Sequence, residues 1–509
     1  MPTDLILTNA KVITMNPAQP ATGLVAVDGD TIFSVSSSDA AARMTGKETR
    51  VIDCGGKTVM PGFNDAHIHL FSFIKKLMSV DVSPEAVKSI ADIKKAIREK
   101  ADKTPPGTWI SGTDYNEFYL AEKHCPTRQD LDEAAPNHPV ILSHRSLHAC
   151  VLNSKALELA GITSETAEPP GGRIERDLAT GEPNGILIDM LGHIRSNVMP
   201  RMSQEELWEG AALADTYFLS HGITSFQEAT VSNDLARWEA VCDLKLDADL
   251  LSRITMMAGA PFYKTFMERQ LKTGSGDNLM QLGAVKIMLE VQPDQEKLNN
   301  LALEIHRAGW QMAFHTIAES TLNAAITALE HAAKVSPTAV RRHRIEHCVE
   351  CPPSLMQRIK TLGAVIVTHP ANLYYSGERY LATVEKSQLP WLYRIKSPMA
   401  AGIKVAAASD APVIPANPLM GIYGAVTRQA ESGQVLQPEE RITIQQALEL
   451  YTVNAAYASF DEKIKGILAP GRLADMIVLS DDPLTVPPEK LKDIKVEMTI
   501  IGGEVVWEG

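Results

Sequence analysis

The second half of the chain alternates short apolar runs with segments of helical periodicity, and this rhythm strongly constrains the fold. Runs rich in valine and isoleucine precede amphipathic stretches that often end in glycine, as in "AVKIML" (284–289) before "DQEKLNNLALEIHRAG" (294–309). Nearly continuous apolar runs that alternate with helices are typical of parallel strands buried on both faces. The pattern therefore predicts an α/β protein built from repeated βα units.

Eight candidate strands of this kind occur along the chain. They span residues 58–66, 223–229, 250–258, 284–290, 311–316, 343–348, 364–368 and 404–410. Eight βα units predict a closed (β/α)8 TIM-like barrel, whose active site lies at the C-terminal ends of the strands. A doubly wound open sheet is the main alternative, and it is disfavoured because no glycine-rich phosphate loop follows a first strand.

The two ends of the chain have a different pattern. Residues 1–57 and 460–509 contain short strands separated by turns, as in "GLVAVDGDTIFSVS" and "VEMTIIGGEVVWEG". We expect them to form one small composite β-sandwich domain, with the barrel made of residues 58–70 and 211–459. Residues 71–210 are too long for one βα connection, so we predict an inserted, partly helical subdomain after the first barrel strand.

Composition limits the kinds of molecule that the protein can bind and the cellular compartment in which we expect it. The 49 lysine and arginine residues against 62 aspartate and glutamate residues give a net charge of −13, which argues against binding to nucleic acid or to an anionic membrane surface. No apolar run is long enough to span a bilayer, and the N-terminus lacks the features of a signal peptide. Six cysteines are too few for a disulfide framework, and "CVEC" has no second pair to complete a four-cysteine zinc site. We expect a cytoplasmic protein that acts on a small molecule.

Two histidines stand one residue apart in "DAHIHLF", at the end of the first candidate barrel strand. Because side chains alternate between the faces of a strand, Asp65, His67 and His69 share one face. Neutral imidazoles that converge in this way are good zinc ligands. Taken alone, the motif is more typical of a half-buried structural strand than of a metal site.

Other candidate strands also carry residues that can bind a metal. His315 ends the fifth strand, His347 ends the sixth and Asp410 ends the eighth, while Lys286 lies within the fourth. A buried lysine is costly unless it is paired or chemically modified. Histidines scattered through a core would not favour the C-terminal ends of strands. The combined pattern therefore predicts a metal site at the mouth of the barrel.

Longer motifs carry a resemblance to a known family. The chain resembles the metal-dependent amidohydrolase superfamily, specifically its YtcJ-like branch (amidohydrolase family 3), which includes N-substituted formamide deformylases. The motifs that carry this resemblance, over nearly the whole chain, are "PGFNDAHIHL", "HACVLNSKALELAGI", "GGRIERDLATGEPNGIL", "GITSFQEA", "RHRIEHC", "ASDAPV", "NPLMGIYGAVTR", "YTVNAAYAS" and "KGILAPGRLADMIVLSDDPL".

The resemblance implies a ligand set for a divalent metal, with zinc the expected ion and one or two ions bound. The implied ligands are His67, His69, His315, His347 and Asp410, with Lys286 where many members carry a carboxylated lysine that bridges two ions. Glu290 shares a strand face with Lys286 and is an alternative bridging group. The resemblance also implies a homodimer.

The expected chemistry is hydrolysis of a non-peptide C–N bond, in an amide or formamide with an apolar substituent. A divalent metal lowers the pKa of bound water from 15.7 to about 7, and Asp410 would take the nucleophile's proton and deliver it to the departing amine. A deaminase or an ester or carbamate hydrolase is the alternative. Glu319 follows His315 by four residues, whereas the proton-shuttling glutamate of deaminases usually follows by three, which weighs against deamination. A non-catalytic scaffold is disfavoured because every expected ligand is present.

Candidate substrate-binding residues are less well determined by the sequence. The segment 374–393 has five tyrosine and tryptophan residues, so it is either a loop packed on the barrel rim or a lid over an apolar substrate pocket. Asp65 is expected to orient a ligand rather than to bind the metal. The candidate substrate contacts are His148, His369, Tyr115, Tyr374 and Trp391.

Overall fold

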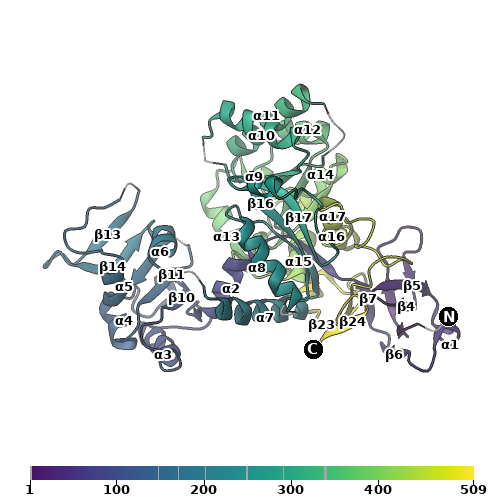
Figure 1. The fold of residues 1–509 in the computed structure, drawn as a ribbon, viewed down its shortest axis with the longest axis horizontal. Coiled ribbons are helices and arrows are strands. Elements are labelled where there is room, and N and C mark those ends of the chain that lie inside the picture. Colours follow the sequence, from purple (N-terminus) through teal and green to yellow (C-terminus); the bar gives the residue numbers. More distant parts are fainter. Residues whose placement is uncertain are drawn as a thin grey trace. The chain divides into compact units, whose positions relative to one another are not determined.

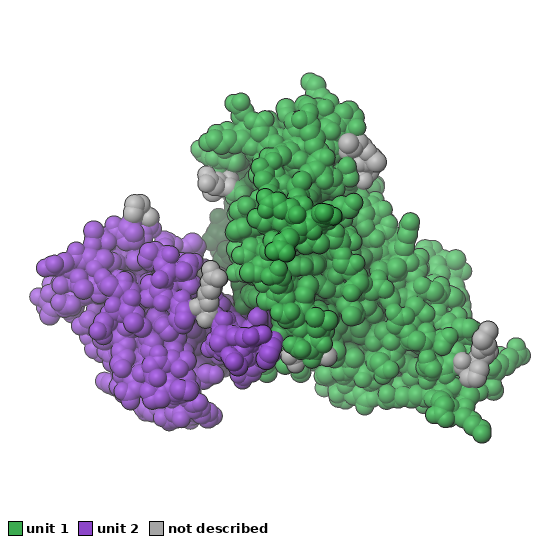
Figure 2. Space-filling model, in the orientation of Figure 1, with its two compact units in different colours: residues 1–73, 211–509 green, residues 74–210 purple. Residues whose placement is uncertain are grey.

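The computed structural model describes residues 3–146, 148–169, 171–200, 202–247, 250–289, 292–337 and 341–509. The chain divides into two compact units (Figures 1 and 2). One unit contains residues 1–73 and 211–509, and the other contains residues 74–210. Within the described residues, no helix combines the length and apolar character that crossing a membrane requires.

Eight parallel strands form the central sheet of the larger unit, in the order β21-β20-β19-β18-β17-β16-β15-β8. The backbone closes the sheet between its first and last strands, because the N–H of Asp410 donates to the carbonyl of His67 at 2.9 Å. The predicted barrel is therefore confirmed. Its strands are β8 (Phe63–Ile68), β15 (Ile223–Glu228), β16 (Arg253–Gly259), β17 (Met280–Ile287), β18 (Met312–Thr316), β19 (Arg344–His347), β20 (Val365–Thr368) and β21 (Val405–Ala407).

Helices follow the barrel strands, and α10 shows how one of them buries an apolar face. In α10 the Asp294 side chain caps the N-terminus and Leu298, Ala302 and Ile305 are buried, as expected from their spacing. The helices of this unit include α8 (Leu235–Leu246), α9 (Tyr263–Glu268), α10 (Gln295–Arg307), α11 (Glu319–Val335), α12 (Pro353–Leu362), α13 (Asn372–Thr383), α14 (Lys396–Ala400), α15 (Pro418–Thr427), α16 (Ile444–Leu450) and α17 (Val453–Ala458).

The first candidate strand, predicted as one element over 58–66, is two strands. β7 (Thr58–Pro61) pairs with strands from both termini, and β8 enters the barrel. Gly62 separates them, and a Cβ atom at this position would lie 2.2 Å from side-chain atoms of Thr224. The close approach of the two backbones at this point therefore requires glycine.

Two further sheets of the larger unit contain the terminal strands. One has the order β5-β4-β1-β6 and the other β24-β23-β22-β7-β2-β3, so the second combines strands from both ends of the chain. Leu5 and Val25 of the first sheet share a buried apolar cluster with Val59, Met476 and Ile500 of the second. The strands are β1 (Leu5–Thr8), β2 (Lys11–Ile13), β3 (Ala21–Thr22), β4 (Leu24–Asp28), β5 (Thr31–Ser36), β6 (Arg50–Asp53), β22 (Met476–Leu479), β23 (Val496–Ile501) and β24 (Glu504–Glu508).

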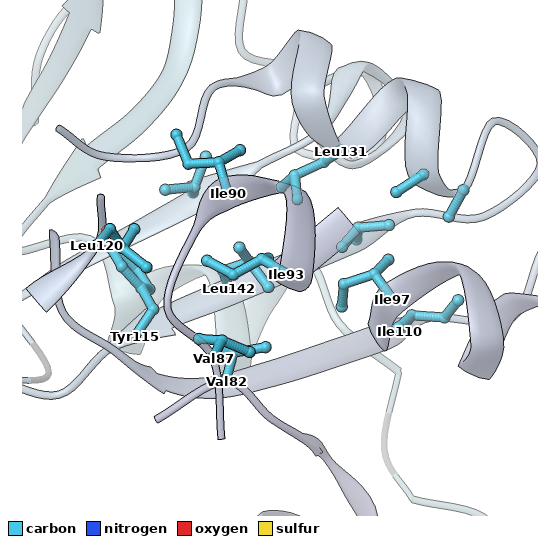
Figure 3. Close-up of a cluster of buried hydrophobic side chains, with 14 of the residues drawn as sticks. Val82, Val87, Ile90, Ile93, Ile97, Ile110, Tyr115, Leu120, Leu131 and Leu142 are labelled. Atoms are coloured by element: carbon cyan, nitrogen blue, oxygen red, sulfur yellow. The ribbon is translucent and has the colours of Figure 1, made fainter. Parts of the chain in front are cut away.

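The smaller unit has its own sheet and its own hydrophobic core. Its strands run in the order β13-β14-β12-β11-β10-β9, and helix α3 packs Ile93 and Ile97 into the core (Figure 3). The elements in or bordering it are α2 (Leu70–Met78), β9 (Val80–Asp81), α3 (Ile90–Ala101), β10 (Ile110–Tyr115), α4 (Arg128–Ala134), β11 (Val140–His144), β12 (Ala149–Leu152), α5 (Ser154–Leu159), β13 (Arg173–Arg176), β14 (Pro183–Ile188), α6 (Leu191–Asn197) and α7 (Gln204–Ser220).

Candidate metal centre

Histidine and aspartate side chains converge at the C-terminal ends of the barrel strands. Two groups of three have all their ligand atoms within 4.8 Å of one another, and His67 belongs to both. The first group adds His69 and Asp410, and the second adds His347 and His369. The structure thus brings together four of the six residues that the sequence proposed as ligands, and it adds His369.

The buried imidazole of His67 is fixed at one nitrogen and open to the site at the other. Its Nδ1 bonds the carboxylate of Glu346. A carboxylate without a proton only accepts, so Nδ1 carries the hydrogen and Nε2 carries a lone pair. That Nε2 lies 3.1 Å from Nζ of Lys286 and 3.6 Å from Oδ1 of Asp410. Burial holds the pKa of His67 well below its usual range, which keeps the ring neutral.

The imidazole of His69 is also fixed at Nδ1, by a residue of the loop after β15. Its Nδ1 lies 2.9 Å from Oγ1 of Thr230, and its Nε2 lies 3.0 Å from Oδ1 of Asp410. The backbone N–H of Thr230 donates to Glu228, which is fully buried at the end of β15. The loop after β15 therefore orients the second histidine of the HxH motif.

His347 and His369 form a buried pair. Nδ1 of His347 lies 2.8 Å from Nε2 of His369, and Nδ1 of His369 lies 3.2 Å from the carbonyl oxygen of Ala408. Burial lowers the pKa of both imidazoles, so both are neutral at physiological pH. Nε2 of His347 is buried and has no hydrogen-bond partner among the described residues.

Asp410 follows β21 in a left-handed conformation, with φ of 63°. Burial by itself would raise the pKa of its carboxyl group, but the neighbouring His69, His369 and Lys286 lower it overall, so the group is ionised. Its Oδ1 is buried and faces ring nitrogens of His69 and His67 at 3.0 and 3.6 Å, and it has no other hydrogen-bond partner among the described residues.

Lys286 and His315 border this cluster. Lys286 is fully buried, and burial lowers the pKa of its amine to about 8, although Glu346 and Asp410 oppose the shift. The ring of His315 lies 4.3 Å from that of His347, centroid to centroid. Burial lowers the pKa of His315 to about 4. His315 is outside both groups of closely spaced ligand atoms.

The donor atoms fit a divalent metal ion. Buried polar atoms are nearly always hydrogen-bonded, yet Nε2 of His347 has no such partner among the described residues, and Oδ1 of Asp410 faces only ring nitrogens. Neutral imidazole nitrogens and a carboxylate oxygen are the ligands that zinc accepts in catalytic sites. The described residues can therefore hold a metal at this point.

Comparison with known proteins assigns the family. The model of the amidohydrolase family matches residues 50–507. The chain belongs to the amidohydrolase family. N-substituted formamide deformylase of Arthrobacter pascens is 28% identical over 545 residues, covering 99% of this chain and 98% of that protein. YtcJ of Bacillus subtilis (strain 168) is 28% identical over 526 residues, covering 94% and 97%. A metal-dependent hydrolase from Pyrococcus horikoshii OT3 has the same fold, with a TM-score of 0.78, 23% identity and coverage of 95% and 99%. The protein is thus an amidohydrolase, a hydrolase of C–N bonds.

Two candidate substrate contacts of this amidohydrolase lie in the smaller unit. Tyr115 is fully buried in the core of that unit (Figure 3), so the prediction that it faces a substrate is wrong. An aromatic residue has the same sequence signal whether it packs in a core or lines a pocket. His148 is largely exposed, and its Nδ1 lies 2.7 Å from Oδ1 of Asp189.

The aromatic segment 374–393 is mainly helical rather than an open loop. Tyr374 lies on α13 and packs against Tyr375 and Tyr423, with ring centroids 5.2 and 5.8 Å away. Trp391 ends the short helix η3 (Leu389–Trp391) and is half-buried. These contacts favour the interpretation that the segment is packed on the rim.

Other residues singled out in the sequence have structural roles or lie outside the described part of the chain. Glu290 lies outside the described residues. Glu319 begins α11 and is exposed, which does not suit a buried proton shuttle. Asp65 accepts from the backbone N–H groups of His67 and Ser409, so it joins two strand ends and holds no imidazole directly. The "CVEC" cysteines are both buried free thiols.

Sequence reasoning missed the residues that fix the ligands, above all Glu346 and Arg344. Arg344 donates to Glu346 through Nε at 2.6 Å and to the carbonyl of Ala66 at 2.7 Å, and both charged side chains are fully buried. The signal was present in "RIEH", where two charged residues alternate within a short apolar strand. Such alternation places both on the inner face of the barrel.

Proposed function

We propose that this amidohydrolase uses a bound divalent metal, zinc by its donor set, to hydrolyse an amide or formamide bond of a small molecule with an apolar or aromatic substituent. The observation that carries the proposal is the buried Nε2 of His347, which has no hydrogen-bond partner among the described residues and lies in one cluster with His67, His69 and Asp410. Buried polar atoms that lack a hydrogen-bond partner are rare in proteins, and a bound metal ion would provide the missing partner.

Some residues of the site would bind the ion, and others orient the side chains that bind it. His67, His69, His347 and Asp410 would bind it, with His315 and Lys286 completing the set. When bound, the ion supplies a nucleophile at neutral pH by lowering the pKa of water and polarises the carbonyl group of the substrate.

Asp410 has the properties of the catalytic base and acid. It is ionised, and its carboxylate oxygens lie 3.6, 3.0 and 3.8 Å from ring nitrogens of His67, His69 and His347. It would remove a proton from the attacking water and return it to the nitrogen of the leaving amine as the C–N bond breaks. One water is consumed, and the products are a carboxylic acid and an amine.

Lys286 is proposed as a carboxylated lysine. Its amine has a pKa lowered to about 8, so a useful fraction is neutral and able to attack carbon dioxide, forming a carbamate and releasing a proton. The carbamate would replace a buried cation by an anion whose two oxygens can bind two ions. Mass spectrometry of the native protein, with and without bicarbonate, would show the added carbon dioxide.

Exposed apolar residues near the candidate ligands favour a substrate with an apolar substituent. Met288, Ile317 and Val413 follow three of the candidate ligands by two or three residues, and these residues are 50%, 44% and 58% exposed. Large apolar side chains exposed around a polar site are typical of ligand contact. The similarity to N-substituted formamide deformylase points to the same class of substrate.

Chelation and reconstitution test the proposal. The protein stripped with a chelator should lose hydrolysis of a panel of N-alkyl and N-benzyl formamides and acetamides, and zinc should restore it. Asp410→Asn should lower kcat by about 10²-fold or more while the protein remains folded. Full activity in the metal-free protein, or in Asp410→Asn, would contradict the proposal. Release of ammonia from an aminopurine instead of cleavage of any amide would favour a deaminase.

A further inference from the structure

The pair of buried histidines at the ends of β19 and β20 has a defined arrangement of protons. The carbonyl oxygen of Ala408 can only accept, so the nitrogen of His369 that faces it at 3.2 Å, Nδ1, carries the hydrogen. A neutral imidazole has a single N–H group, and therefore Nε2 of His369 is an acceptor. The neighbouring Nδ1 of His347, at 2.8 Å, must then be the donor.

This arrangement determines which nitrogen of His347 can bind a ligand. With its hydrogen on Nδ1, His347 presents a bare lone pair at Nε2, the buried atom that has no partner among the described residues. In the opposite tautomer that atom would carry a hydrogen and could not bind a cation. The carbonyl of Ala408 thus sets the state of His347 through His369.

We infer that His369 is a positioning residue that fixes His347 in the tautomer whose Nε2 is free to bind the metal. The inference rests on the metal site of the proposed function. It replaces the interpretation of His369 as a substrate contact, because the side chain is 1% exposed and both ring nitrogens are engaged.

Two substitutions separate loss of the acceptor from loss of the ring. In His369→Gln, Oε1 can occupy the place of Nε2 and accept from His347. In His369→Leu the volume is similar but the acceptor is gone. His343→Asn is the matched control, because His343 is also a mostly buried imidazole that faces a second histidine, and it lies outside both groups of potential ligands.

The main measurement is the affinity of each full-length variant for Zn²⁺ and Co²⁺ by chelator competition, with the visible spectrum of the Co²⁺ form. His369→Leu should bind about 10- to 100-fold more weakly, as is usual when the partner of a metal-bound histidine is removed. His369→Gln should recover most of the affinity with an unchanged spectrum, and His343→Asn should bind like the wild type. KM for a formamide should stay constant in zinc-saturated His369→Gln.

Several outcomes would overturn the inference. Wild-type affinity in His369→Leu would show that the contact has no role. Loss of a bound ion in both variants, with a changed Co²⁺ spectrum, would make His369 a direct ligand. A raised KM with unchanged affinity would make it a substrate contact. If the wild type itself binds neither metal, the proposed function fails, and that result is distinct from these three.

The proton positions can be measured directly, even if His369→Leu does not fold. With ¹⁵N-labelled histidine in the metal-free wild type, long-range ¹H–¹⁵N spectra should show both His347 and His369 with the hydrogen on Nδ1. A hydrogen on Nε2 of His347 would contradict the inference. In a His347→Gln background, His369→Leu should cause no further loss of metal affinity, because its effect is transmitted through His347.

Discussion

The guanidinium of Arg344 and the carboxylate of Glu346 form a buried ion pair that also holds His67. Glu346 accepts from Nδ1 of His67 and from two nitrogens of Arg344, and neither charged side chain is exposed. Removing one member of such a pair leaves an uncompensated charge in a site that water does not reach. The pair therefore affects both the stability of the barrel and the orientation of the ligand.

Glu346→Gln should lower both metal affinity and stability. The variant keeps the shape of the side chain but removes the charge that compensates Arg344, so the free energy of unfolding should fall by about 3 kcal/mol. Weaker orientation of His67 should reduce zinc affinity by about tenfold or more. Urea denaturation and chelator competition measure the two effects.

A partly exposed ion pair gives the control for this substitution. Glu330 accepts from Arg358 at 2.7 Å, and their side chains are 43% and 31% exposed. Glu330→Gln should cost no more than about 1 kcal/mol and leave zinc affinity unchanged, because solvent screens the pair. Equal losses in the two variants would show that burial of the Arg344 pair has no special effect.

Strands β18 and β19 are joined at their N-terminal ends through an uncharged imidazole. Nδ1 of His343 accepts from the backbone N–H of Met312 at 3.0 Å, and its Nε2 faces Nδ1 of His306 at 3.0 Å. Burial lowers the pKa of His343 to about 3. Protonation of Nδ1 would remove the acceptor for the N–H of Met312, so folding favours the neutral form of His343.

This shift predicts how stability depends on pH. Above the unfolded pKa of about 6.5, His343 is neutral in both states and has no effect on the pH dependence. As the pH falls below that value, the unfolded chain binds a proton that the folded chain does not, and this group lowers stability by about 1.4 kcal/mol per pH unit until the pH approaches 3. His343→Asn keeps an acceptor without this titration, so its loss of stability between pH 6.5 and 4.5 should be smaller. Parallel profiles of the two proteins would contradict the prediction.

The junction between β7 and β8 depends on a residue without a side chain. A methyl group at Gly62 would lie 2.2 Å from Thr224 atoms, so Gly62→Ala should destabilise the larger unit by about 1–3 kcal/mol. Gly192 is exposed on α6, and a Cβ atom there would meet no heavy atom of the described residues within 4 Å. Gly192→Ala should therefore be neutral or stabilising by up to about 1 kcal/mol. Thermal unfolding of both variants measures the difference, and similar shifts would contradict the close approach.

Local periodicity was enough to predict the barrel but not its first junction. The βα rhythm identified all eight strands because each is short, apolar and followed by a helical segment. It joined β7 to β8 because nothing in the apolar run 58–66 shows that Gly62 separates two sheets. That boundary is set by a contact with Thr224, which lies far away in the sequence.

The candidate ligands followed from their positions on strands, whereas their supporting residues did not. Simple alternation predicted that His67 and His69 point the same way; His67 lies in β8, His69 follows its last residue, and His347 ends β19. The partners of these rings come from other strands, as Glu346 does for His67 and His369 for His347. One sequence gives no register between distant strands, and the register decides which polar side chains meet.

At the scale of the whole molecule, the candidate ligands and the inserted segment belong to different compact units. All six lie in residues 1–73 and 211–509, and the smaller unit has an apolar core of its own. Helices α2 and α7, which lead into and out of the insert, touch each other: a Cβ atom on Gly210 would lie 2.3 Å from Cγ2 of Ile74 and 2.9 Å from Sδ of Met78. The chain therefore leaves and returns at nearly the same place.

A variant in which a short glycine–serine linker replaces residues 79–203 should fold and bind metal. The two helices are kept, and the linker has only to join neighbouring helix ends, which costs little loop entropy. Zinc content per chain should equal that of the full-length protein. Saturating zinc should raise the unfolding temperature, because the ion binds only the folded state. A folded variant with the far-ultraviolet spectrum of an α/β protein but no bound zinc would show that the smaller unit helps to form the metal site, contrary to this prediction.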